Sequence, residues 1–281
     1  MAGLRVVEVR GAHYRYPGVP ALNGIDVDLN EGEFCALVGQ NGSGKTTLAK
    51  HLNGLLKPDA GSVTVFGHDT RRASVGELAR EVGYVFQNPD HQIFSANVRN
   101  ELAFGPRNLG LSNGDVRART DEALCAFGLE AYADLPPATL GFGLRRLVSV
   151  AAVYAMRPRL FVLDEPTAEL DWRSAHDLLD RFRALHEQGH TVLLISHDME
   201  LVAEYAQRVL LMRDGRIVAD APPATFFSQR ELLADAHLTP PQVMRLAQRL
   251  GDTGIPTETL TVDAFVATYL ALLKQRRHNA G

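Results

Sequence analysis

Residues 39–47 read GQNGSGKTT, and this spacing of glycines, lysine and threonine is typical of a phosphate-binding loop. The stretch follows an apolar run, FCALV at 34–38, and opens a helix-compatible segment at 48–56. It therefore has the order of strand, glycine-rich loop and helix that such a loop requires. A plain glycine-rich turn with a surface lysine is the alternative interpretation, and the complete spacing argues against it.

The residue types in this stretch fit a triphosphate. Glycines let the backbone bring its N–H groups close to an anion, and the following helix directs its positive end to the same place. Lys45 adds a positive charge for the outer phosphates, and the Thr46 hydroxyl can bind Mg²⁺. We therefore expect nucleotide contacts from the whole stretch: Gly39, Gln40, Asn41, Gly42, Ser43, Gly44, Lys45, Thr46 and Thr47.

Composition describes an ordinary globular chain of 281 residues, with 46% apolar and 22% charged residues. The net charge of −4 gives no basic field for nucleic acid, so we expect no nucleic-acid partner. Cys35 and Cys125 lack metal-ligand or redox spacing. The start, MAGLRVVEVRGAH, has no apolar signal core, and the apolar stretch 147–156 is too short to span a bilayer. We expect a cytosolic chain that reaches a membrane through a partner.

Periodicity predicts an α/β protein. Alternating or continuous apolar runs predict strands at 4–9, 25–29, 63–66, 82–86, 160–163, 191–195 and 208–212. Helical spacing predicts helices at 115–127, 173–188, 241–250 and 261–274. Strand signals vanish between about 98 and 157, which suggests a helical insert, and the pattern changes again near residue 222. The sequence therefore favours a parallel-sheet core with a helical insert and a small helical appendage.

A second motif, LFVLDEPTAELD at 160–171, ends an apolar strand in two adjacent carboxylates. Asp164 fits a holder of Mg²⁺, and Glu165 is placed to orient an attacking water or to accept its proton. A turn that only caps the next helix is the alternative. Pairing with the loop at 39–47 favours the catalytic interpretation.

Two further polar residues follow predicted strands. His197 in LLISHDM could reach a γ-phosphate, although a lone histidine is often structural. Gln87 follows the strand at 82–86, and glutamine is also a common surface residue. Their position at the ends of strands favours a role at the same site.

The order of these motifs resembles the nucleotide-binding subunit of ABC transporters over nearly the whole chain. GQNGSGKT resembles the Walker A loop, LFVLDEP the Walker B segment and AELD at 168–171 the D-loop, while Gln87 and His197 match the Q-loop and switch positions. Tyr16 matches an aromatic residue that stacks on adenine, with core packing as the alternative. The resemblance implies a P-loop NTPase core with an antiparallel β-subdomain and a helical subdomain at about 98–157. It also implies an ABC ATPase domain over 1–222 and a C-terminal helical appendage over 223–281 that makes dimer contacts.

Three stretches resemble the energy-coupling-factor (ECF) ATPases of cobalt and vitamin uptake, namely those at 85–111, 196–223 and 238–251. In that family a pair of ATPases binds a transmembrane coupling protein, which holds a substrate-capturing membrane protein. The resemblance implies these partners, a place at the cytoplasmic face of the membrane, and import of a metal ion or vitamin. Asp90 and Glu101 are acidic candidates to meet basic helices of the coupling protein, or else ordinary solvated carboxylates.

The resemblance also implies the site chemistry, which is hydrolysis of ATP with Mg²⁺. Lys45, Glu165 and His197 are the expected catalytic residues. The expected metal site consists of Thr46, Gln87 and Asp164, and the expected nucleotide contacts add Tyr16 and Gln87 to the loop residues.

The chain departs from the family at its signature motif. The family has LSGGQ followed by an arginine, whereas residues 140–151 read LGFGLRRLVSVA, with Leu147 in place of that arginine. Gly141 offers no hydroxyl to a γ-phosphate, and the side chain of Phe142 obstructs close backbone approach. Loss of one preorganised donor to a developing anion costs roughly a hundredfold or more in rate. We therefore expect an asymmetric heterodimer, in which a partner with an ordinary signature completes this chain's site.

Three alternatives remain open at this point. They are the ATPase of a conventional binding-protein-dependent importer, a regulatory ATP-binding subunit with weak turnover, and a soluble ABC ATPase that acts on nucleic acid or ribosomes. The sequence does not identify the transported substrate, because this subunit would not contact it.

Overall fold

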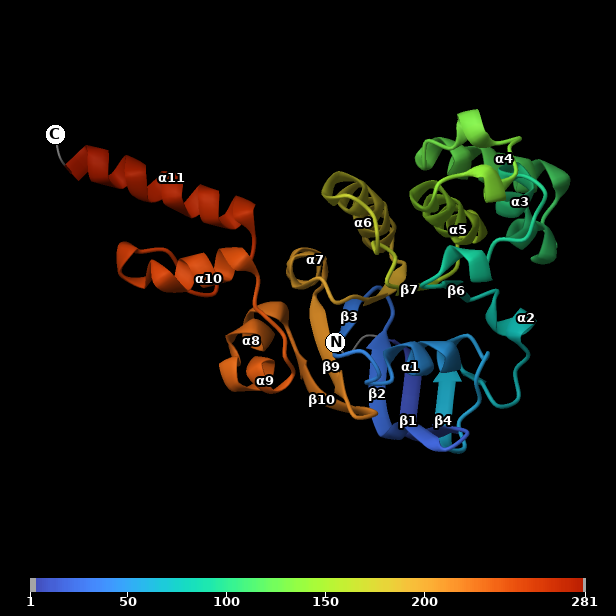
Figure 1. Ribbon diagram of the computed structural model, residues 1–281, viewed down its shortest axis with the longest axis horizontal. Helices are drawn as coiled ribbons and strands as arrows, with labels where there is room; N and C mark the ends of the chain where they lie inside the picture. Colours follow the sequence, from blue (N-terminus) through green and yellow to red (C-terminus); the bar gives the residue numbers. More distant parts are fainter. Residues whose placement is uncertain (1–3, 280–281) are drawn as a thin grey trace.

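Two β-sheets form the centre of the computed structural model, which describes residues 4–279 (Figure 1). The six-stranded sheet has the order β10-β9-β3-β8-β7-β6 and is parallel except for β10, which pairs antiparallel with β9. The second sheet is antiparallel, in the order β2-β1-β4-β5. The strands are β1 (Arg5–Tyr16), β2 (Val19–Asn30), β3 (Phe34–Val38), β4 (Ala60–Val65), β5 (His68–Asp69), β6 (Val82–Val85), β7 (Leu160–Asp164), β8 (Thr191–Ile195), β9 (Arg208–Arg213) and β10 (Arg216–Ala221).

Helix α1 (Lys45–Leu52) lies between the two sheets. Its buried residues Leu48, Ala49 and Leu52 belong to a core cluster that also contains side chains of β1, β2, β3 and β7. Strand β3 is buried along its whole length, as expected for a central parallel strand. The first turn of α1 is therefore held rigidly at the carboxyl end of β3.

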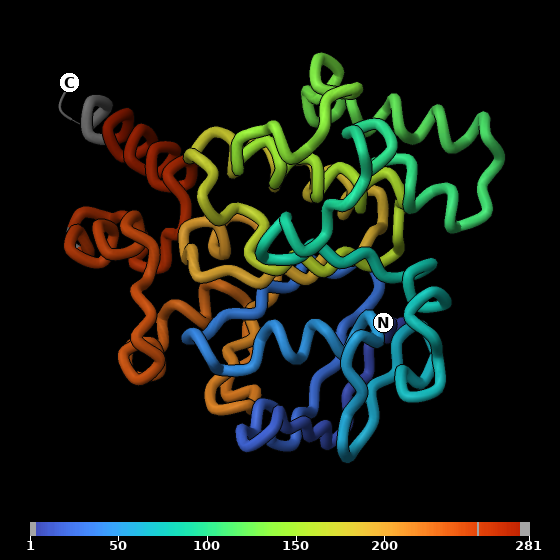
Figure 2. Tube along the Cα trace, turned by 45° about the vertical axis from the view of Figure 1, so that its right-hand side comes forward, coloured from blue at the N-terminus to red at the C-terminus, as the bar shows by residue number. Residues whose placement is uncertain are grey.

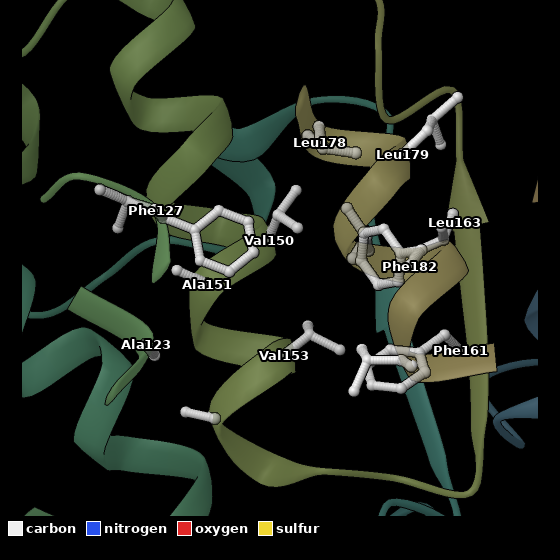
Figure 3. Packing of buried hydrophobic residues seen from close by; sticks show 14 of the residues in the cluster. Ala123, Phe127, Val150, Ala151, Val153, Phe161, Leu163, Leu178, Leu179 and Phe182 are labelled. Carbon is white, nitrogen blue, oxygen red and sulfur yellow. The ribbon is translucent and has the colours of Figure 1, made fainter. Parts of the chain in front are cut away.

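A helical segment separates β6 from β7 and lies apart from the antiparallel sheet (Figure 1, green). It contains α3 (Val98–Asn108), α4 (Asn113–Ala126) and α5 (Phe142–Met156), with short 3₁₀ turns at Pro89–His91, Glu130–Tyr132 and Pro137–Thr139. Figure 3 shows how this segment joins the core: Phe127 and Val153 belong to the same buried cluster as Phe161 of β7 and Phe182 of α6 (Trp172–Glu187). Burial of side chains this large contributes about 1.5–3 kcal/mol each.

The C-terminal part of the chain forms a row of helices beside the six-stranded sheet (Figure 2, orange to red). Strands β8 and β9 are joined through α7 (Met199–Tyr205), and α8 (Pro223–Ser228) and α9 (Arg230–Asp235) follow β10. Phe226, Phe227 and Leu233 pack on α7 and β9 in one buried cluster. Helices α10 (Gln242–Arg249) and α11 (Val262–Asn279) extend farther from the sheet, as Figure 1 shows. The remaining short elements are α2 (Val75–Leu78) and a 3₁₀ turn at Gly251–Thr253.

The predicted strands and helices are confirmed with shifts of a few residues, except that β1 and β2 extend well beyond 4–9 and 25–29. Strand β10 was not predicted, because it is an edge strand with little buried apolar surface. It is created by the turn at Asp214 and Gly215, both of which have positive φ. No helix in the described part of the chain has the length and apolar character needed to cross a membrane.

Candidate functional site

Four neighbouring strands of the six-stranded sheet end at one edge and supply the polar residues of the site. Parallel pairing of β3, β8, β7 and β6 brings their carboxyl ends together. The loop at 39–44 follows β3, His197 follows β8, Asp164 ends β7 and Gln87 follows β6. Ligands of open α/β sheets bind at this edge. The sheet order thus explains why motifs far apart in the sequence act at one place.

The loop at 39–44 has a shape that only glycine permits at two positions. Gly39 has φ of +144°, and a Cβ there would lie 2.1 Å from the carbonyl oxygen of Met212. Gly44 has φ of +105°, and its Cβ would lie 2.5 Å from the carbonyl oxygen of Ala21. The hairpin turn between β9 and β10 supports the loop, because Gly215 N–H donates to the carbonyl of Ser43 at 3.0 Å. The loop is therefore fixed by close contact with the surrounding backbone.

Lys45 begins helix α1 and points back into the loop. Its side chain is buried, and its Nζ donates to the carbonyls of Gly39 at 2.7 Å and Gln40 at 3.0 Å. Burial lowers the pKa of Lys45, while the nearby charges of Glu165 and Asp164 act in the opposite direction. These two backbone carbonyls thus hold the ammonium group at the loop.

Asp164 is a buried carboxylate with an open coordination position. Its Oδ2 accepts a hydrogen bond of 2.9 Å from the hydroxyl of Tyr84, whereas Oδ1 has no hydrogen-bond partner among the described residues. Burial raises the pKa of Asp164, whereas the hydrogen bond from Tyr84 and the charge of Lys45 act in the opposite direction. A buried carboxylate oxygen without a partner is costly unless a cation or donor occupies its position. This donor set fits Mg²⁺, which binds through one or two protein oxygens together with substrate phosphates.

Glu165 is held in a strained conformation next to His197. Its φ is +50°, which is uncommon for a residue other than glycine, and its N–H donates to the carbonyl of Ile195 at 3.0 Å. The Oε2 of Glu165 lies 2.8 Å from Nδ1 of His197. Glu165 is only 7% exposed, whereas His197 is largely exposed. The carboxylate is therefore directed by the backbone and by a single histidine contact.

A cavity of about 530 Å³ joins most of the predicted residues. This volume suits a ligand of nucleotide size. The cavity is lined by Tyr16, Val19, Pro20, Ala21, Asn41, Gly42, Gly44, Lys45, Thr46, Thr47, Gln87, Asp164, Glu165 and Ile195. Tyr16 is 37% exposed there and packs edge-on against Tyr14, with ring centroids 5.0 Å apart. Its ring is available as an apolar wall for a flat ligand.

Four predicted residues do not line this cavity: Gly39, Gln40, Ser43 and His197. The carbonyl of Gly39 accepts from Lys45, and His197 contacts Glu165. Ser43 is buried, and its hydroxyl has no partner among the residues that the structure describes. The Gln40 amide bonds to the C-terminal part of the chain, at Ala236 and His237. A side-chain contact of Gln40 with the nucleotide therefore stays a prediction.

Comparison with known proteins identifies the fold family. The family model for the ABC transporter ATP-binding domain matches residues 22–168. The chain belongs to the ABC transporter ATP-binding family. It therefore carries an ABC ATPase domain with a P-loop NTPase fold, the kind of domain that binds and hydrolyses ATP.

Individual relatives carry names from the same family. A putative ABC transporter ATP-binding protein, TTE1589 of Caldanaerobacter subterraneus, is 44% identical over 91% of this chain, which spans only 45% of that protein's length. The energy-coupling factor transporter ATP-binding protein EcfA of Methanothermobacter thermautotrophicus is 39% identical over 95% of this chain and 88% of its own length. Among solved structures, cbiO1 of Clostridium perfringens, part of the ABC transporter complex cbiONQ, superposes with a TM-score of 0.72. It is 32% identical and covers 88% of this chain and 99% of its own.

Residues 140–144, the segment expected to correspond to the family's signature motif, lie at the start of α5 and do not line the cavity. Gly141 is the N-cap of α5 and provides no side-chain cap. Among the described residues, none of 140–144 lines the cavity around Lys45. Residues 140–144 are therefore not part of this cavity.

Arg146 makes structural contacts beside the cavity residue Gln87 that sequence reasoning missed. Leu147 occupies the position expected for the arginine and is partly buried in the apolar core. The preceding Arg146 is only 1% exposed, and its guanidinium donates to the carbonyls of Phe86, at 2.9 Å, and Gln87. It thus ties the signature helix to the Q-loop. The sequence could not show which of Arg145 and Arg146 is buried, because the two adjacent residues differ only in the direction they face around the helix.

The expectation that Glu101 offers a free carboxylate to a membrane protein is wrong. Glu101 is only 3% exposed, and its Oε2 accepts from the backbone N–H groups of Phe94 at 3.1 Å and Ser95 at 2.8 Å. It therefore shapes the loop before α3. Asp90 remains a half-exposed carboxylate, with Oδ1 at 3.0 Å from Nε of Arg145. Asp90 stays a candidate contact.

Proposed function

We propose that this chain is the ATP-hydrolysing subunit of an ECF-type importer of a metal ion or vitamin. The single observation that carries the proposal is the cavity in which Lys45, Asp164 and Glu165 meet. A lysine for phosphate charge, a carboxylate for a metal and a second carboxylate for water are the parts that phosphoryl transfer to water needs. Asp164 and Glu165 lie at the carboxyl end of β7, and Lys45 begins α1 after the loop that follows β3, so their geometry depends on the packed core.

Thr46, Gln87 and Asp164 would hold Mg²⁺ in this site. When bound, Mg²⁺ neutralises charge on the β- and γ-phosphates. The free Oδ1 of Asp164 supports this assignment, since Tyr84 already satisfies the other oxygen. The Tyr84 hydroxyl thereby fixes which carboxylate oxygen is available.

The protein residues divide the remaining work. Lys45 and the loop N–H groups stabilise negative charge on the phosphates, and Tyr16 stacks on the adenine ring. Glu165 accepts a proton from the attacking water, and His197 holds the Glu165 carboxylate in position through the contact of 2.8 Å.

The same proposal includes an asymmetric pair of ATPases. Residues 140–144 do not line the cavity, which supports a second subunit that would bring its own signature motif to the nucleotide. Gly141 and Phe142 make this chain's own signature a poor donor to the partner's nucleotide. A partner ATPase with an ordinary signature would give one fast site and one slow site.

The membrane partners follow from the ECF assignment. Two relatives support it, EcfA by its name and cbiO1 by its membership of cbiONQ. We propose that the chain sits at the cytoplasmic face of the membrane, bound to a transmembrane coupling protein that holds a substrate-capturing membrane protein. The segment from Gln87 to Leu111 and the C-terminal helices are the proposed contacts for the coupling protein and the second ATPase, with no nucleic-acid partner.

Co-purification tests this assignment. Purification of the tagged chain in mild detergent should bring down a second ATPase, a coupling protein and a small substrate-capturing protein. Recovery with an extracytoplasmic binding protein instead would assign the chain to a conventional importer. The altered signature favours one further candidate, a regulatory subunit that binds ATP and hardly turns over. ATP hydrolysis that stays negligible after addition of the partner would support that candidate.

A further inference from the structure

A short connector, residues 236–242, links the core to the outer C-terminal helices and contacts both the phosphate loop and the start of α7. It runs from the end of α9 to the start of α10, as Figure 1 shows. Pro240 and Pro241 restrict its backbone, and His237 has φ of +52°. The connector is therefore a stiff segment with one residue in the left-handed region.

The first contact joins the connector to the phosphate loop. The Nε2 of Gln40 donates to the carbonyl of Ala236 at 3.2 Å and lies 2.9 Å from Nδ1 of His237. A carboxamide NH₂ has two hydrogens, so both contacts can be made together when Nδ1 is the acceptor. Rotating the amide by 180° would oppose its oxygen to the Ala236 carbonyl, which fixes the orientation. Both donors of this side chain are thus used by the connector.

Gln40 transmits this contact to the lysine. Its backbone carbonyl accepts from Nζ of Lys45 at 3.0 Å, beside the Gly39 carbonyl at 2.7 Å. Holding the Gln40 side chain therefore restricts the carbonyl that orients the lysine. A loop already in its binding conformation loses less entropy when a phosphate binds.

The second contact joins the connector to the switch region. The N–H of Gln242, at the start of α10, donates to Oε1 of Glu200 at 3.3 Å. Glu200 lies in the first turn of α7, whose N-cap, Asp198, directly follows His197. One stiff segment thus contacts the loop that holds Lys45 and the helix that follows the switch histidine.

We propose that His237 is a positioning residue for the phosphate loop, and that the connector couples the C-terminal helices to ATP binding. The inference rests on nucleotide binding at Lys45 and adds a regulatory path to it. Because coupling between two binding sites is reciprocal, a subunit that binds the C-terminal helices changes ATP affinity, and ATP changes the affinity for that subunit.

Two variants of the full chain test the role of His237. His237→Gly removes the imidazole at a position where glycine relieves backbone strain, so the fold should keep or gain stability. His237→Asn keeps an acceptor, Oδ1, at the same number of bonds from the backbone as Nδ1, and asparagine tolerates the left-handed region. The measurements are the Kd for a non-hydrolysable ATP analogue with Mg²⁺ and the amide hydrogen exchange of residues 39–47.

The expected result is a Kd about 3- to 10-fold higher for His237→Gly, the value of one neutral hydrogen bond, with faster exchange in the nucleotide-free loop. His237→Asn should lie within about twofold of the wild type. A purely structural role would lower the thermal midpoint and leave the Kd of the folded protein unchanged. If the wild type binds the analogue and His237→Gly binds it equally well, the inference is wrong. If the wild type itself does not bind, the proposed nucleotide site is wrong and the inference falls with it.

Discussion

The Nδ1 atom of His197 lies 2.8 Å from the Oε2 atom of Glu165 and thereby links the end of β8 to the end of β7. Glu165 is nearly buried and has φ of +50°, while His197 is largely exposed. A strained backbone aims the carboxylate, and an exposed histidine holds it. Such backbone strain is found at functional sites, and we therefore expect substitutions in this pair to affect the chemistry at the cavity.

Replacing His197 by alanine should lower ATP hydrolysis about 10- to 100-fold, since a small displacement of a catalytic group is costly. ATP affinity should change little, because His197 does not line the cavity. His176→Ala is the matched control: His176 lies 3.2 Å from the Glu204 carboxylate and outside the site. Single-turnover hydrolysis with the partner ATPase present measures the effect. Equal losses of ATP hydrolysis in the two variants would contradict the role assigned to His197.

Lys45→Ala should weaken ATP binding about 10- to 100-fold, which corresponds to the loss of a charge-assisted hydrogen bond. Lys50→Ala, on the same helix α1, changes the net charge equally and should bind ATP as the wild type does. A fluorescent nucleotide titration gives both constants. Comparable weakening by Lys50→Ala would show that general charge, and not the position of Lys45, determines the affinity.

Two adjacent arginines should differ strongly in their contribution to stability. Arg146→Ala removes a buried guanidinium and leaves the partly buried carbonyls of Phe86 and Gln87 without their donor, so it should cost about 3 kcal/mol. Arg145→Ala loses an ion pair with the half-exposed Asp90 and a hydrogen bond to the Leu140 carbonyl at 3.0 Å, and should cost about 1 kcal/mol. Urea denaturation of the two variants makes the comparison. Similar costs would contradict the structural role assigned to Arg146.

His51 should make stability depend on pH. It is fully buried with Nδ1 at 2.7 Å from the Thr47 carbonyl, and burial lowers its pKa. The unfolded chain, with an ordinary histidine pKa of about 6.5, then binds more protons than the folded chain below that value. The stability is therefore present above about pH 6.5 and is lost as the pH falls below it.

The test compares the wild type with His51→Gln, which cannot titrate at this position. Between about pH 7.5 and 5.5 the free energy of unfolding should fall more steeply in the wild type. Parallel slopes for the two proteins would mean that His51 does not contribute to the pH dependence.

The motifs of the site could be predicted because each is local. Lys45, Asp164, Glu165 and His197 all follow or end a buried strand, and adjacent parallel strands place such residues together. The strands themselves could be predicted because continuous apolar runs are typical of the buried strands of a parallel sheet.

The missed features depend on contacts that no local pattern encodes. From the sequence, Glu101 was expected at the surface, but it is buried and accepts hydrogen bonds from the loop before α3. The sequence identifies Tyr84 only as a strand residue, whereas in the structure its hydroxyl donates a hydrogen bond to Asp164. The contact between Gln40 and His237 joins residues that are 197 positions apart. Only the packing of the C-terminal helices beside the loop brings that pair together.

The most direct test of the account is the Glu165→Gln variant, measured for both binding and hydrolysis. The amide cannot accept the proton of the attacking water, yet it keeps the shape of the side chain and the contact with His197. We predict unchanged or tighter ATP binding, with hydrolysis lowered about a hundredfold or more. Hydrolysis at the wild-type rate in this variant would contradict the assignment of Glu165 and, with it, the catalytic role of the cavity.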